Sequence, residues 1–131
     1  MIDTTALPLS SLHEKLGIEI TRVSATEVVG SMPVTGNTQP AGLLHGGATA
    51  ALIEGLASLA AWLHAHPERV AVGVDLNVTH LRPVASGRVT GRAVPVRLGS
   101  GTVVHAVEVH DDGGRLTATG RLTSQLVAPK K

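Results

Sequence analysis

Two features of one long apolar stretch have the types and spacing to do chemistry together. Glu54 is the only acidic or basic side chain between Gly46 and Leu63, and the stretch opens with the pair Gly46-Gly47. Glycine carries no Cβ, so a ligand can come close to the backbone N–H groups at the positively polarised start of a helix. Such N–H groups stabilise negative charge that develops on a carbonyl oxygen. A carboxylate about two turns further along therefore predicts a catalytic pair.

The same carboxylate has a purely structural explanation, which stays open at this point. Residues 46–64 are dominated by Ala and Leu, with no proline until Pro67, and this composition predicts a helix. The stretch is apolar on every side, which predicts a helix buried on all faces. An acid in such surroundings costs free energy unless it is paired or hydrogen-bonded. Glu54 could be satisfied by a backbone amide or by a second subunit and take no part in chemistry.

The remaining segments predict an antiparallel sheet of five to six strands that curls around this helix, in the α+β class. One sheet cannot surround a cylinder, so we expect a second subunit on the uncovered side. Pro95 predicts a bulge or an edge position, and residues 111–114 predict a hairpin turn. We expect strands at 18–23, 27–34, 70–81, 87–98, 102–110 and 116–127, and a short helix at 12–16 that begins at Ser10 or Ser11 and ends at Gly17. The chain is expected to form a single domain over 1–131, with an extended arm at 1–8 and a polar tail at 128–131.

Composition excludes several classes of function. Trp62 is the only aromatic residue and the formal net charge is +1, so neither a base-stacking platform nor a basic nucleic-acid surface is expected. The absence of cysteine excludes disulfides, thiolate zinc sites and iron–sulfur clusters. The first residues lack the pattern of a signal peptide, and the long helix is expected to be too short for a membrane span. We therefore expect a cytoplasmic protein that binds neither membrane nor nucleic acid.

The residues before and along the long helix resemble a known enzyme family. The stretch TQPAGLLHGG at residues 38–47, followed by Glu54 and Ser58, resembles the hotdog-fold acyl-CoA thioesterases of the phenylacetate-degradation type. Among these it looks most like the 1,4-dihydroxy-2-naphthoyl-CoA thioesterases of menaquinone biosynthesis and the 4-hydroxybenzoyl-CoA thioesterases. The resemblance runs from Leu16 to Leu126. It implies the hotdog fold, with a long central helix wrapped by a curved antiparallel sheet, and hydrolysis of an acyl-CoA thioester.

The resemblance also implies a role for each matching residue. The active site would be shared between subunits, with Gln39, His45 and Gly46 from one chain and Glu54 and Ser58 from its partner. The Gly46 N–H would polarise the thioester carbonyl, and Glu54 would act as nucleophile or as the base that activates water. Gln39 and His45 would position the thioester and assist the leaving sulfur. Ser58 would hold the attacking water.

The substrate and the assembly are expected from the same resemblance. Four residues in segments 77–82 and 98–100 would hold the nucleotide end of coenzyme A: His80, Arg82, Gly99 and Ser100. The alanines 50, 51, 57 and 61 leave space beside the helix, which is consistent with an aromatic acyl group. We expect no cofactor beyond the coenzyme A of the substrate. We also expect a homodimer that forms a tetramer as a dimer of dimers.

Other interpretations compete with these assignments. Ser58 could bond back to the Glu54 carbonyl, His45 could be a structural residue at the helix start, and His80 and Arg82 could simply face solvent. His64 and His66 lack a nearby third ligand, so we expect no metal site. The chain could also be a noncatalytic acyl-CoA or aromatic-ligand binding protein, or an acyl-thioester hydratase or dehydratase. The carrier could be coenzyme A or a carrier protein.

Overall fold

The computed structural model describes Leu7 and residues 10–130 of the 131-residue chain. The arm expected at 1–8 lies outside the described residues, apart from Leu7. The elements in chain order are α1 (Ser11–Leu16), β1 (Glu19–Val23), β2 (Val28–Pro33), α2 (Gly46–Ala65), β3 (Val70–His80), β4 (Arg88–Leu98), β5 (Thr102–Asp111) and β6 (Leu116–Val127). Their bounds lie within two residues of those expected from the sequence.

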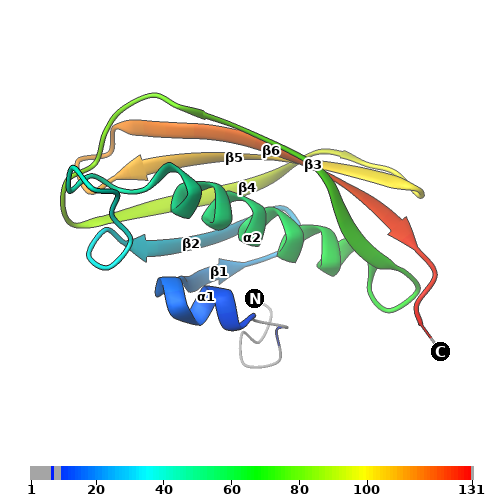
Figure 1. The fold of residues 1–131 in the computed structure, drawn as a ribbon. Coiled ribbons are helices and arrows are strands. Elements are labelled where there is room, and N and C mark those ends of the chain that lie inside the picture. Colours follow the sequence, from blue (N-terminus) through cyan, green and yellow to red (C-terminus); the bar gives the residue numbers. More distant parts are fainter. Residues whose placement is uncertain (1–6, 8–9, 131) are drawn as a thin grey trace.

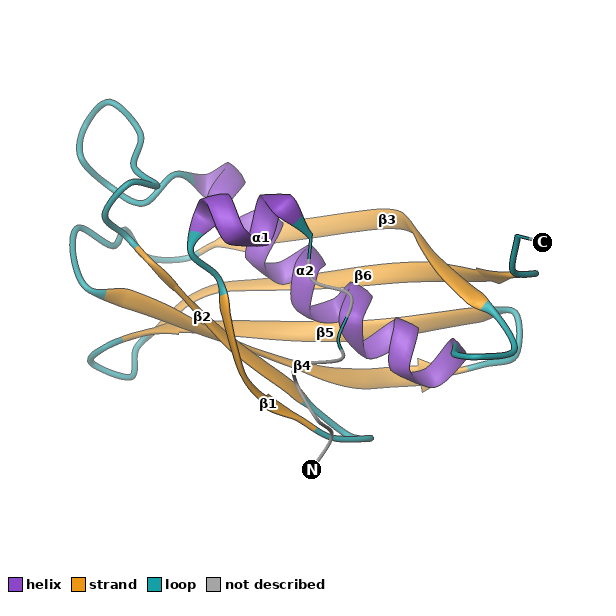
Figure 2. Ribbon diagram, turned by 90° about the horizontal axis from the view of Figure 1, so that it is seen from below, coloured by secondary structure: helices purple, strands orange, loops and turns teal. Residues whose placement is uncertain are grey.

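The strands form one six-stranded sheet in the order β1-β2-β4-β5-β6-β3, and every neighbouring pair is antiparallel. The sheet curls around α2, which crosses its concave face (Figures 1 and 2). The predicted α+β class and the hotdog arrangement are therefore confirmed. β3 lies at one edge of the sheet, where it pairs only with β6 among the described strands.

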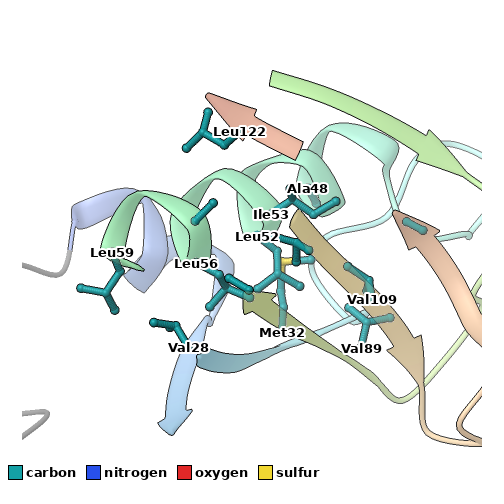
Figure 3. Close-up of a cluster of buried hydrophobic side chains, with 14 of the residues drawn as sticks. Val28, Met32, Ala48, Leu52, Ile53, Leu56, Leu59, Val89, Val109 and Leu122 are labelled. Atoms are coloured by element: carbon teal, nitrogen blue, oxygen red, sulfur yellow. The ribbon is translucent and has the colours of Figure 1, made fainter. Parts of the chain in front are cut away.

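The core forms where the apolar side chains of α2 press against the sheet (Figure 3). Two glycines make the close approach of helix and sheet possible. Gly30 on β2 and Gly91 on β4 lie opposite each other in the sheet. A Cβ at either position would lie 2.7 Å from a methyl group of Leu56. Leu56 is fully buried over this glycine pair, with Leu52 and Ile53 fully buried beside it. The glycines thus form a notch that sets how deeply α2 sits in the sheet.

Within one chain, α2 is not buried on all faces, because the sheet covers only one side of it, and Glu54 lies on the uncovered side, where a second subunit is expected. The expectation that α2 is too short for a membrane span is wrong: its 20 residues are long and apolar enough by length and composition alone. Half of that span is buried inside the protein, however, and α2 is the core helix of the fold.

Several local predictions are confirmed. The Ser10 side chain caps α1 by accepting from the His13 N–H, and Gly17 ends that helix in the left-handed region at φ 74°. The pairing of β4 with β5 shifts register after Pro95, which is the expected bulge. The turn between β5 and β6 carries Gly114 at φ 80°.

Candidate active site

The loop that leads into α2 is fixed by the buried side chain of Asn37. Its Nδ2 group donates to the carbonyl oxygen of Leu16 at 2.7 Å and to that of Pro33 at 2.9 Å. The backbone carbonyl oxygen of Asn37 accepts from the His45 N–H at 2.8 Å. One residue thereby joins the end of α1, the end of β2 and the start of α2. The position of the α2 N-terminus is set by these three bonds.

The first turn of α2 leaves one backbone N–H available. His45 is the N-cap: its Nδ1 accepts from the Gly47 N–H at 2.8 Å. Its carbonyl oxygen accepts from the N–H groups of Ala48 and Thr49 at 3.0 and 3.2 Å. The Gly46 N–H has no hydrogen-bond partner among the residues that the structure describes. It is therefore an unused donor at the positive end of the helix dipole, which suits the polarisation of a carbonyl group.

A cleft of about 390 Å³ opens at this end of α2, and we call it the Gly46 cleft. Gly46, Gln39, His80 and Arg82 all line it. His80 Nε2 lies 2.9 Å from the position that a Cβ on residue 46 would take, so the imidazole packs directly on the glycine. Four of the nine candidate site residues are thus brought together, and His45 caps the helix beside them.

Gln39 and Arg82 keep donors available in the Gly46 cleft. The Oε1 atom of Gln39 accepts from the Ala41 N–H, which leaves the side-chain amide N–H groups unused among the described residues. The Nη1 atom of Arg82 donates to the Leu116 carbonyl at 2.7 Å, and this bond holds the side chain in place. The rest of the guanidinium group is available, and its planar set of donors matches a phosphate or a carboxylate.

A second cleft of about 420 Å³ lies further along α2, and we call it the Glu54 cleft. Glu54, Gly55, Ser58 and Trp62 line it from α2, and His13 lines it from α1. The Oε2 atom of Glu54 lies 3.1 Å from the position that a Cβ on Gly73 of β3 would take. The carboxylate is exposed and forms no ion pair with any residue between 10 and 130. It is therefore free to act on a ligand.

The two clefts are separate half-sites within one chain. Glu54 lies eight positions after Gly46 in α2, which corresponds to a rise of roughly 12 Å along the helix axis. A thioester group is far smaller than that, so it cannot touch the Gly46 N–H and the Glu54 carboxylate of one helix together.

The four residues expected to hold coenzyme A do not meet within one chain. His80 and Arg82 lie at the N-terminal end of α2. Gly99 and Ser100 lie at its C-terminal end, where a ring nitrogen of His64 is 3.1 Å from the Gly99 carbonyl oxygen. The reason is topological: β4 follows β3 in the chain and runs the other way, so the two strands end at opposite ends of the sheet (Figure 1).

Two further expectations can be compared with the structure. Ser58 lines the Glu54 cleft, and its hydroxyl makes no hydrogen bond to the Glu54 carbonyl. Of the four alanines expected to leave space for an acyl group, only Ala51 lines this cleft. Ala57 and Ala61 are fully buried on the sheet side of α2, so that part of the expectation is wrong.

Sequence reasoning missed two residues of the Glu54 cleft. Trp62 stacks on His66 with ring centroids 4.5 Å apart and presents an aromatic wall to the cleft. His13 reaches the cleft from α1, and burial lowers the pKa of its imidazole. No motif contains His13. The sequence shows only that His13 is a titratable residue on a short helix. It does not show which element that helix packs against.

Comparison with known proteins gives a consistent result. The family model described as the thioesterase superfamily matches residues 41–118. The proofreading thioesterase EntH of Klebsiella pneumoniae is 47% identical over 108 residues, which cover 82% of this chain and 79% of that protein. The 1,4-dihydroxy-2-naphthoyl-CoA hydrolase of Escherichia coli is 38% identical over 86% of this chain and 83% of that protein. A thioesterase structure from Haemophilus influenzae superposes with a TM-score of 0.87 at 39% identity and covers 90% of this chain and 83% of that one.

Proposed function

The chain belongs to the thioesterase superfamily and is a thioester hydrolase of the hotdog fold, and on this premise we propose that it hydrolyses an aromatic acyl-CoA. The observation that carries the proposal is the unused Gly46 N–H in a cleft that also holds Gln39 and Arg82. A helix N-terminus with a free donor stabilises the oxyanion that forms when a thioester carbonyl is attacked. The available N–H groups of Gln39 position the thioester beside it.

Glu54 supplies the carboxylate for the attack, by one of two routes. As a general base it takes a proton from water, and the hydroxide adds to the carbonyl carbon. As a nucleophile it adds directly, the C–S bond breaks to give a mixed anhydride, and water then cleaves the anhydride. In both routes the thiolate leaves and is protonated, and the acyl group ends as a free acid. Ser58, one turn after Glu54, holds the attacking water.

The two half-sites come together when a second copy of the chain faces the first. Because Gly46 and Glu54 are roughly 12 Å apart on one helix, the reacting pair combines Gly46 of one subunit with the same carboxylate of its partner. The free edge of the sheet supports such pairing. Val70, Val72 and Val74 of β3 are 40, 46 and 57% exposed, and an unpaired strand with exposed apolar side chains invites another strand. We place a homodimer at this edge, and two such dimers form the tetramer.

The acyl group occupies the Glu54 cleft. Its walls include Leu12, Leu59 and Trp62, so they offer apolar surface and an aromatic face to a planar acyl group. Arg82 and His80 at the Gly46 end take the phosphates of coenzyme A, together with Gly99 and Ser100 of another subunit. The reaction needs no other cofactor, and we place it in the cytoplasm. The similarity to the 1,4-dihydroxy-2-naphthoyl-CoA hydrolase supports an aromatic substrate.

Release of free thiol from acyl-CoA tests this function. Wild-type enzyme should hydrolyse benzoyl-CoA with a higher kcat/KM than hexanoyl-CoA or acetyl-CoA. Glu54→Gln should lose at least about 100-fold in kcat, since it removes the base or nucleophile, and should still bind benzoyl-CoA. Glu108→Gln, an exposed carboxylate on β5, is the matched control and should retain wild-type activity. Saturable binding without thiol release in the wild type would instead identify a binding protein, and faster linear substrates would overturn the aromatic assignment.

A further inference from the structure

His13 occupies a place on α2 that is left open for it. A Cβ on Gly55 would lie 2.3 Å from His13 Nε2, and the three atoms nearest to that position all belong to the His13 ring. The imidazole therefore fills the space that any side chain at residue 55 would take. Gly55 is the immediate neighbour of Glu54, and both residues line the Glu54 cleft with His13. The ring contacts Gly55 through Nε2 at the wall of the Glu54 cleft, and Nε2, unlike Nδ1, is not fully enclosed by the protein.

The other ring nitrogen defines the chemical state of His13. The Nδ1 atom is buried and has no hydrogen-bond partner among the described residues. A protonated imidazole carries N–H on both nitrogens, so the cation would place a charged donor at Nδ1 with no acceptor. Burial accordingly lowers the pKa of His13 below the ordinary 6.5. We assign the single hydrogen of the neutral ring to Nε2, the nitrogen at the cleft wall.

From this geometry we infer that His13 is a specificity-determining residue, which offers a neutral N–H donor to an oxygen substituent on the acyl group. The inference rests on the proposed function, because it places the acyl group in the Glu54 cleft. The lining of the Glu54 cleft also includes Leu12, Leu59 and Trp62, whose side chains give mainly apolar surface, and three polar residues: Ser10, Glu54 and Ser58. A hydroxyl group on an aromatic acyl ring therefore gains a partner at His13. An unsubstituted ring gains only the contact with its face.

The first test compares His13→Phe with the wild type on benzoyl-CoA and its 3- and 4-hydroxy derivatives. Phenylalanine keeps a planar ring and removes both nitrogens. Loss of one neutral hydrogen bond should lower the preference for the better hydroxylated substrate about three- to tenfold. The kcat/KM for benzoyl-CoA, which has no hydroxyl group, should fall by less than that for the better hydroxylated substrate. His110→Phe, a second histidine on β5 outside the Glu54 cleft, is the matched control and should leave the preference unchanged.

The second test displaces the ring without changing it. Gly55→Ala places a methyl group where His13 lies, so it should lower the same preference in the wild-type background. In His13→Ala the space beside residue 55 is empty, so adding Gly55→Ala should change the substrate preference little. The two substitutions should therefore show a large coupling in a double-mutant cycle of that preference.

The outcomes separate the two proposals. If the wild type is active on aryl thioesters and His13→Phe changes all three substrates equally, His13 is only part of the wall and its assignment is overturned. Additive effects of Gly55→Ala and His13→Ala contradict the contact on which it rests. A wild type that is inactive on all three aryl thioesters overturns the proposed substrate class, and the role of His13 with it.

Discussion

The imidazole of His80 packs on the α-carbon of Gly46, with Nε2 only 2.9 Å from the position that a Cβ on residue 46 would occupy. The ring at the end of β3 and the first residue of α2 therefore share one small space. Any side chain at residue 46 must move that ring, which lies next to the free N–H of the same residue. The contacted atoms are the far end of a flexible side chain, so the fold can adjust at little cost.

Gly46→Ala should therefore impair activity much more than stability. We expect kcat/KM to fall about 10- to 100-fold, less than for complete loss of an oxyanion donor, because the N–H remains but its approach is obstructed. The melting temperature should change by no more than a few degrees. Gly113→Ala, in the turn between β5 and β6, is the matched control and should affect neither quantity. A large fall in the melting temperature of Gly46→Ala would show that the glycine serves the fold instead.

His45 has a structural task that can be separated from its chemical one. His45→Ala removes the acceptor for the Gly47 N–H and should lower the free energy of unfolding by about 1 kcal/mol. His45→Asn restores a good N-cap and should recover that stability. It should leave kcat low, because the imidazole that the resemblance expects to assist the leaving sulfur is then missing. Urea unfolding and steady-state kinetics on the same two variants check this, and full recovery of kcat in His45→Asn would restrict His45 to capping.

Subunit exchange tests whether the site is shared. Gln39→Ala and Glu54→Gln should each be nearly inactive alone. In a mixed dimer one site carries both changes and the other carries neither. Random exchange should therefore restore about a quarter of wild-type activity, since half of the dimers are mixed and one of their two sites is intact. If activity stays at the level of the single variants after verified exchange, the two residues act within one chain.

Stability should fall in acid because of a buried histidine. The His105 side chain is 3% exposed, and its Nδ1 has no hydrogen-bond partner among the described residues. Burial, and secondarily the nearby His64, lowers the pKa of His105 below 6.5. Below pH 6.5 the unfolded chain binds a proton at this histidine more readily than the folded chain does. The contribution of neutral His105 to the free energy of unfolding is therefore complete above pH 6.5 and is lost as the pH falls through the lowered pKa.

The check is urea unfolding between about pH 8 and about pH 5. His105→Leu should show a shallower loss of unfolding free energy across this range than the wild type. His110→Gln should keep the wild-type slope, since His110 is partly exposed. Identical slopes in all three proteins would assign the acid sensitivity to other groups, among them His13.

The sequence predicted the described helices and strands because the composition and periodicity of neighbouring residues indicate each of them. The Ala- and Leu-rich composition of residues 46–64 favours a helix. Along the strands, apolar and polar residues alternate with period two between turn residues. The exposure of Glu54 could not be predicted in this way. Which side of an apolar helix the sheet covers depends on the contact of Leu56 with Gly30 and Gly91, and this contact joins residues far apart in the chain.

The sequence named candidate site residues and expected Gly46 and Glu54 to come from different subunits, but it did not predict that the four coenzyme A residues lie apart within one chain. The motif at 38–47 placed Gln39 and Gly46 in one cleft because they are close in the chain. His80 and Ser100 were grouped by resemblance, and the direction of the strands separates them in a single chain. His13 was missed because its role depends on its contact with Gly55. Nothing in the sequence around either residue indicates that contact.

The glycine donor and the carboxylate both belong to α2, so the distance between them is set by helical rise and not by a loop. In a twofold pair of such helices, the alignment of each shared site would depend on how far one helix is offset along the other. A contact that shifts one helix along the other by a fraction of a turn would change the distance between the Gly46 N–H and the partner's carboxylate equally in both sites. Because the twofold axis would relate the two proposed sites, such a change in one site would be matched in the other.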